Sequence, residues 1–197
     1  MSADPRPAGD RRQPDPDIDD VRAAQANRAE FGVLYRRYLE RVYGYCFYLL
    51  GDHHDAEDVT ERTFMAALDA VDRFRDEGAT FRSWLFRIAH NQLANALRAR
   101  SRRRTESLDG MLEPAAATGD PARMASLADE ARRLRVAVAS LSNDRRQVVI
   151  LRFVDGLTTR EIGVVLGRSD GAVRVLQHRA LREIATLLER DGSIASG

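Results

Sequence analysis

The feature that most constrains the fold of this chain is a pair of short amphipathic segments separated by a glycine. The first segment begins with Thr-Thr-Arg-Glu, so that the Thr158 hydroxyl and the Glu161 carboxylate are spaced to cap the start of a helix reciprocally. Gly167 then permits a tight turn, and Ser169 or Asp170 is placed to cap a second helix. Together these signals predict a helix-turn-helix.

The second helix of this pair is predicted to have one apolar face and one polar face. Its apolar residues recur at steps of three, four and one: Val173, Leu176, Ala180, Leu181 and Ile184. In a DNA-binding helix-turn-helix, the N-terminal half of the second helix lies against base edges in the major groove. The outward residues there become DNA-binding candidates: Ser169, Arg174, Val175, His178 and Arg179. An ordinary helical hairpin with solvated arginines is the plainer alternative, because capping boxes and amphipathic pairs are common.

Apolar residues keep the same three- and four-residue spacing through most of the remaining chain, which predicts further helices. The predicted helices run from about Phe31 to Gly51, from the acidic stretch after Asp52 to about Arg73, from Phe81 into an arginine cluster, from Leu127 to Ser140, and from Ser142 to Asp155. No segment shows the alternation typical of a β-strand. We therefore expect an all-α protein.

Changes in composition divide this helical pattern into two small domains. The first 25 residues are rich in Pro, Asp and Arg without apolar periodicity, and residues 105–123 are rich in small residues, Gly and Pro. We predict a disordered arm at 1–25, a helical domain at 26–104, a flexible linker at 105–123, a second helical domain at 124–190 and a tail at 191–197.

The basic residues are unevenly distributed, although the formal net charge is only +1. All 31 basic residues are arginines, a side chain that binds phosphates and guanine edges in a two-pronged geometry. Five of them crowd residues 98–104, on a predicted helix that also carries Trp84, Asn91 and Asn95. Such groups stack on unpaired bases and bind phosphates, although most charge runs are simply solvated and Trp84 fits a core position.

Several classes of function find no support in the sequence. Cys46 is the only cysteine, so no internal disulfide can form, and the N-terminus lacks the apolar segment of a secretory signal. A cytoplasmic protein is expected. The neighbouring His53 and His54 would not face each other on a helix, and no second cluster of metal ligands is evident. Without a nucleophile–base pair or phosphate loop, we expect no enzyme, no metal and no cofactor.

Three segments together resemble the extracytoplasmic-function (ECF) group of the sigma-70 family. They are DAEDVTERTFMAAL at 55–68, TFRSWLFRIAHNQLANALRARSRR at 80–103, and the helix-turn-helix. The resemblance implies a first domain, region 2, that docks on the clamp helices of RNA polymerase and melts the minus-ten element. It implies a second domain, region 4, that binds the minus-thirty-five element and the polymerase flap. The alternative is a helix-turn-helix regulator with an N-terminal dimerisation or sensing domain.

The resemblance also implies roles for individual residues. The polymerase-docking positions are Asp55, Asp58, Val59 and Phe64. Phe74 and Asn91 match a pocket for a base flipped from the non-template strand, and the minus-ten set is completed by Arg75, Asn95 and Arg98. The outward residues of the helix-turn-helix match the minus-thirty-five positions. Glu61-Arg62 stands where the family often has Gln-Glu, so the resemblance implies a docking surface that differs from the family pattern at these two positions. An anti-sigma factor is a further implied partner, whose identity the sequence does not encode.

Overall fold

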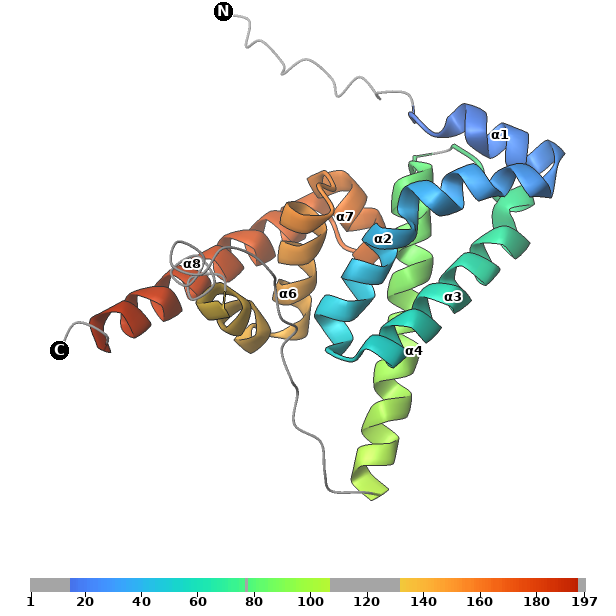
Figure 1. The fold of residues 1–197 in the computed structure, drawn as a ribbon. Coiled ribbons are helices and arrows are strands. Elements are labelled where there is room, and N and C mark those ends of the chain that lie inside the picture. Colours follow the sequence, from blue (N-terminus) through green and yellow to red (C-terminus); the bar gives the residue numbers. More distant parts are fainter. Residues whose placement is uncertain (1–14, 77, 107–131, 195–197) are drawn as a thin grey trace, which may run out of the picture.

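The computed structural model describes residues 15–76, 78–106 and 132–194, and the predicted all-α fold is confirmed for them (Figure 1). No strand occurs within these ranges, and none of the helices there is long and apolar enough to cross a membrane. Residues 107–131, which contain most of the predicted linker and the start of the helix predicted at Leu127, lie outside the described part of the chain.

Four α-helices form the first domain. They are α1 (Ile18–Ala26), α2 (Phe31–Leu50), α3 (His53–Ala70) and α4 (Phe81–Glu106), with short 3-10 turns η1 (Arg28–Glu30) and η2 (Val71–Arg73). Gly51 ends α2 in the left-handed conformation, with φ of 69°. Directly afterwards the Asp52 carboxylate caps α3 by accepting the backbone N–H of Asp55 at 2.8 Å. The sequence prediction of two helices joined at this point is therefore confirmed.

The described part of the second domain starts at residue 132, and residues 132–140 are helical. It continues with α6 (Asn143–Val149), a π-helical turn η3 (Ile150–Val154), α7 (Thr159–Leu166) and α8 (Asp170–Ile194). Ser142 occupies the predicted cap position of α6 but makes no side-chain cap hydrogen bond. As predicted, the chain turns at Asp155-Gly156, where Gly156 has φ of 66°.

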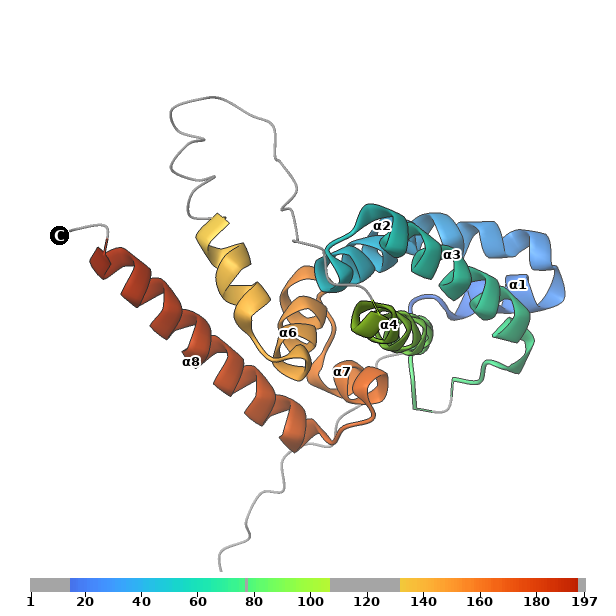
Figure 2. The ribbon, with the colours of Figure 1, turned by 90° about the horizontal axis from the view of Figure 1, so that it is seen from below.

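The hydrophobic core is continuous between the two domains. Helix α4 packs against α3 in the first domain and against α7 in the second (Figure 2). Buried residues from both domains join one cluster, including Tyr45 and Phe86 from the first and Leu151, Leu157 and Ile162 from the second. A smaller cluster holds the 132–140 helix against α6 and α8. The two domains are therefore in direct contact over apolar surface.

The structure corrects three details of the sequence prediction. Helix α1 lies within the predicted disordered arm, because Val21 and Ala24 bury completely against the first domain; residues 1–14 lie outside the described part. Helix α4 extends two residues into the predicted linker, and α8 extends to Ile194, into the predicted tail. Leu181, assigned to the inward face of α8, is instead 43% exposed.

Candidate nucleic-acid interface

The helix-turn-helix begins with the predicted capping box. Thr158 accepts the backbone N–H of Glu161 on its hydroxyl oxygen at 3.2 Å, and Glu161 accepts the backbone N–H of Thr158 at 2.8 Å. These two bonds satisfy amide groups that a helix N-terminus otherwise leaves without partners. The start of α7 is thus fixed by local side chains.

Two glycines shape the turn that follows α7. Gly167 takes the left-handed conformation with φ of 63°, as the sequence predicted. Gly163 allows a close approach, because a Cβ atom there would lie 2.7 Å from the backbone oxygen of Arg168. Ser169 then caps α8 by accepting the backbone N–H of Ala172 at 3.3 Å. Sequence reasoning found Gly167 from its position but missed Gly163, which lies inside a helix and has an unexceptional neighbourhood in the sequence.

The first turns of α8 present the predicted minus-thirty-five set to solvent. All five of its members are exposed, whereas Val173 and Ala180 on the opposite side are fully buried. Val175 is 48% exposed, so its side chain adds an apolar group to this surface. The resulting surface combines two guanidinium groups, an imidazole and a small apolar side chain.

The exposed face of α4 carries three residues of the predicted minus-ten set. Asn91, Asn95 and Arg98 are all exposed, and the Arg98 guanidinium donates to Asn95 Oδ1 at 2.7 Å. Arg75 is also exposed, on the loop that leads into α4, where it donates to the carbonyl oxygens of Asp72 and Phe74, each at 2.8 Å. The structure thus gathers amide and guanidinium groups along α4 and at its N-terminal loop.

Phe74, the fifth member of the minus-ten set, lies in an aromatic cluster and is only 4% exposed. Its ring meets Phe81 edge-on at 5.9 Å and Trp84 edge-on at 5.4 Å between ring centroids. Trp84 is partly buried, which agrees with its assignment to the core. In this arrangement a base reaches Phe74 only if neighbouring side chains move.

A groove of about 640 Å³ runs between α2 and α3. Of the four predicted docking residues, only Phe64 lines this groove, where it is 5% exposed. Asp55 and Asp58 lie on the solvent side of α3, whereas Val59 is 1% exposed within the core. Sequence reasoning missed the apolar side chains that complete the groove: Tyr35, Leu39, Met65 and Leu68. Tyr35 is 40% exposed although it lies among the regularly spaced apolar residues of α2, and its side chain lines the groove.

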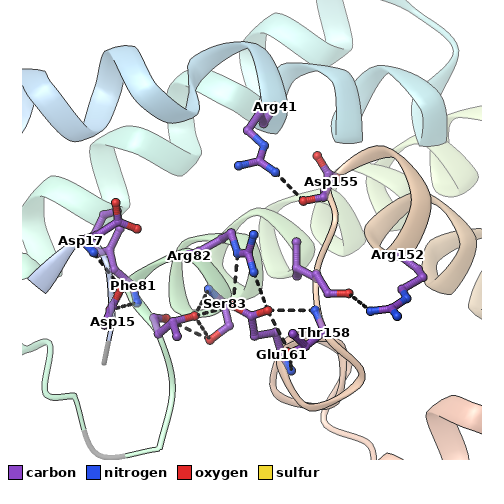
Figure 3. A network of polar contacts seen from close by, with 12 residues as sticks. Asp15, Asp17, Arg41, Phe81, Arg82, Ser83, Arg152, Asp155, Thr158 and Glu161 are labelled. Carbon is purple, nitrogen blue, oxygen red and sulfur yellow. Dashed lines mark hydrogen bonds and ion pairs between the residues drawn. The ribbon is translucent and has the colours of Figure 1, made fainter. Parts of the chain in front are cut away.

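A polar network joins α4 to the start of the helix-turn-helix (Figure 3). The Arg82 guanidinium donates to both oxygens of the Glu161 carboxylate, at 3.1 and 2.6 Å, and the Thr80 hydroxyl donates to it at 2.8 Å. Nearby, Arg41 of α2 donates to the backbone oxygen of Asp155 at 2.5 Å. We refer to these contacts between the two domains as the interdomain network.

Two carboxyl groups of this region have pKa values shifted in opposite directions. Burial raises the pKa of Asp155 to about 7, and one oxygen of this carboxyl has no hydrogen-bond partner. Burial opposes ionisation of Glu161 as well, but the Arg82 guanidinium and the Thr158 amide outweigh it and hold the pKa of Glu161 below its ordinary value. Glu161 is therefore charged and fully paired within the interface.

His53 and Cys46 are accounted for by structural contacts and burial. His53 hydrogen-bonds through Nδ1 to the Tyr43 hydroxyl at 2.5 Å and stacks on Phe47. Within the described residues no cluster of His, Cys, Asp and Glu has the arrangement of a metal site. Cys46 is completely buried, and burial raises the pKa of its thiol to about 12.

Comparisons with known proteins match both domains in order. The models for Sigma-70 region 2 and Sigma-70, region 4 match residues 34–103 and 131–187. The chain is 38% identical to the ECF RNA polymerase sigma factor BldN of Streptomyces coelicolor over 87% of its own length, and 35% identical to SigD of Mycobacterium tuberculosis over 72%. It spans 65% of the length of each of these two relatives.

Other relatives match over nearly their whole length. SigL of Mycobacterium tuberculosis is 30% identical, with 86% of this chain and 95% of the relative covered. Among solved structures, CnrH in complex with the cytosolic domain of CnrY has a TM-score of 0.65 at 28% identity, covering 88% of this chain and 97% of the other. RpoE of Bartonella quintana has the same TM-score at 23% identity, a likeness of fold alone. These matches show that the chain belongs to the ECF RNA polymerase sigma factors of the sigma-70 family.

Proposed function

We propose that this chain is a promoter-specificity subunit that directs core RNA polymerase to selected promoters and promotes strand opening there. The observation that carries the proposal is the exposed basic face on the first turns of α8, with Arg174, His178 and Arg179 outward above a buried apolar face. In a helix-turn-helix, this is the face that contacts base edges in the major groove. Because the chain belongs to the sigma family, we infer that this contact is made to the minus-thirty-five element.

The proposed minus-ten surface is the exposed side of α4 with its N-terminal loop. Asn91, Asn95 and Arg98 supply donors and acceptors for phosphates and unpaired base edges, with Arg75 at the loop. Phe74 offers an aromatic ring beneath this loop. Strand opening then needs no covalent chemistry, because contacts to an extruded base offset an unstacking cost of a few kcal/mol. The protein therefore acts as an initiation factor and not as an enzyme.

The proposed polymerase-docking surface is the groove between α2 and α3. Tyr35 and Met65 are 40% and 56% exposed there, so they present apolar area that the first domain itself does not cover. Asp58 supplies a charge on the adjoining side of α3, while Val59 supports the groove from within the core. Apolar area flanked by charge is the usual composition of a protein interface.

Further partners and location follow as parts of the same proposal. A regulatory protein of the anti-sigma type is inferred as a partner from the sigma-factor resemblance, and the similar protein CnrH also occurs in complex with a second protein, the cytosolic domain of CnrY. We place the protein in the cytoplasm, where RNA polymerase is found. The rival function, a regulator that binds DNA without polymerase, has no observation in its favour because both sigma regions match in sequence order.

Run-off transcription with purified core polymerase and mapped start sites tests the proposal. The full chain is expected to direct transcription from specific start sites that core polymerase alone does not use. Met65→Glu, which places a charge in the apolar groove, is expected to weaken binding to core polymerase at least tenfold. The protein should stay folded, because Met65 is exposed to solvent. Asp69→Asn is the control, since Asp69 is also exposed on α3 but does not line the groove. Absence of any specific start site, or no stoichiometric binding to core, would contradict the proposal.

A further inference from the structure

The loop between α3 and α4 is held at its beginning by a side chain from α1. The Gln25 amide nitrogen donates to the backbone oxygen of Val71 at 2.9 Å and to that of Phe74 at 3.1 Å. Both oxygens belong to the end of the α3–η2 segment, where carbonyl groups run out of helical partners. One side-chain NH₂ group therefore fixes the direction in which the chain leaves η2.

The end of the same loop is held by a residue that precedes α1. One oxygen of the Asp15 carboxylate accepts the backbone N–H of Phe81 at 2.5 Å, and the other accepts the N–H of Asp17 at 3.0 Å. Phe81 is the first residue of α4, so Asp15 satisfies an amide that the helix itself leaves unpaired. Asp15 is only 3% exposed, and these two hydrogen bonds favour its ionised form although burial raises its pKa.

One short segment, residues 15–25, thus hydrogen-bonds to the backbone at both ends of the loop. A third contact, between Arg28 and Asp72 at 2.9 Å, is exposed to solvent and adds little. Among the described residues of the loop, Arg75 and Asp76 are exposed and Gly78 takes φ of 104°, so these three are not held by burial in the core. Without Gln25 and Asp15, the backbone at the two loop ends would be less restricted, and the exposed Arg75 would take more positions relative to α4.

We propose that Gln25 is a positioning residue for base discrimination at the minus-ten element, acting through the backbone of Val71 and Phe74. Asp15 performs the same task at the other end of the loop, through the backbone of Phe81. This inference rests on the proposed function, because it assumes that the loop and α4 bind the opened strand. A loop fixed before binding loses less conformational entropy on contact with a base, and it accepts fewer wrong bases.

The test uses the full chain with core polymerase and a set of promoters in which each minus-ten base is replaced in turn. Gln25→Glu keeps the shape of the side chain but removes the donor and sets a carboxylate against two carbonyl oxygens. We expect the preference for the favoured base to fall about tenfold at one or more minus-ten positions. Binding to core polymerase and to a minus-thirty-five duplex should be unchanged. Gln25→Lys, which restores a donor, is expected to recover discrimination.

The charge-matched control is Ala23→Glu, which adds the same charge to an exposed position of α1. It is expected to discriminate like the wild type. If Gln25→Glu gives the same base profile as Ala23→Glu, or if Gln25→Lys fails to recover the profile, the positioning role is wrong. A variant that is only destabilised would lose transcription from all promoters in the same proportion, and such a result would also refute the inference. Thermal unfolding of each variant would reveal the destabilisation. If the wild type itself initiates from no promoter, the proposed function fails and not the inference alone.

Discussion

The contact between Arg82 and Glu161 allows a quantitative prediction about how the two domains are held together. The guanidinium makes a two-pronged contact with the carboxylate, and the two side chains are only 24% and 10% exposed. A hydrogen bond to a charged group contributes about 1.5–3 kcal/mol. Thr80 and Thr158 continue to donate to Glu161 when Arg82 is removed, which limits the loss. We expect a coupling free energy of about 2 kcal/mol between the two residues.

A double-mutant cycle measures this coupling free energy. Arg82→Met keeps most of the apolar stem, and Glu161→Gln keeps the capping role, because glutamine also serves at that position of a capping box. We call molecules closed when the two domains are in contact and open when they are apart. Each single substitution is expected to lower the ratio of closed to open molecules, and the coupling of about 2 kcal/mol corresponds to roughly 30-fold in that ratio. The double variant is expected to be little worse than either single variant.

Single-molecule energy transfer between dyes on the two domains gives the populations. Cysteines introduced at the exposed positions Glu57 and Arg182 carry the dyes, while Cys46 is buried and its raised thiol pKa makes it unreactive. The control cycle uses the exposed pair Arg168–Asp144, at 2.9 Å, whose coupling should not exceed about 0.5 kcal/mol. Additive effects of Arg82→Met and Glu161→Gln, within about 0.5 kcal/mol, would refute the reasoning.

Three further predictions concern single residues. Burial raises the pKa of Asp155 to about 7, so ionisation of this carboxyl opposes the folded state, and the free energy of unfolding should fall as pH rises from about 4 through 7. Asp155→Asn should remove that fall when the free energy is measured by urea titration at each pH. If the variant keeps the pH profile of the wild type, the raised pKa of Asp155 is excluded as its cause. Arg174→Ala should weaken binding to a minus-thirty-five duplex by about 1–3 kcal/mol without affecting core binding, and equal activity on every promoter variant would count against a base contact. Asn91→Ala should impair transcription from duplex promoters more than from a pre-melted bubble; equal impairment of both templates would argue against a role in opening.

The helix-turn-helix was predictable because its determinants are local. Thr158 and Glu161 are three residues apart, Gly167 takes the conformation that its position requires, and Ser169 caps the next helix as one of two predicted candidates. The apolar spacing of α2, α3 and α4 likewise predicted these three helices correctly. In each case the interacting groups lie within one or two helical turns, where sequence spacing determines geometry.

Helix α1 was not predictable in the same way because its partners are distant in sequence. Gln25 bonds to residues 46 and 49 positions away, and Asp15 to a residue 66 positions away. Its own sequence, IDDVRAAQA, offers few large apolar residues and follows a stretch rich in Pro, Asp and Arg, so it resembles part of a disordered arm until those partners are present. The contact between the domains has the same character, since Tyr45 and Gln147 hydrogen-bond at 3.2 Å across 102 positions.

Glu161 shows why a sequence pattern over a few residues does not predict such long-range contacts. The capping box accounts fully for a glutamate at this position, so nothing in the sequence is left to indicate its second role with Arg82. A residue that satisfies a local rule can still carry a long-range contact, because a carboxylate accepts several hydrogen bonds at once. Here one carboxylate caps α7 and also attaches it to α4.

The interdomain network and the proposed minus-ten surface use different sides of α4. Arg82 and Asn91 are nine residues apart, which is two and a half turns of an α-helix, so they lie on opposite faces. The second domain contacts the Arg82 side, and Asn91, Asn95 and Arg98 stay exposed. Contact between the domains therefore does not cover either proposed DNA surface. The contact between the domains instead fixes the distance between the two proposed DNA surfaces. A promoter whose minus-ten and minus-thirty-five elements do not match that distance can therefore engage both surfaces only after the Arg82–Glu161 contact opens.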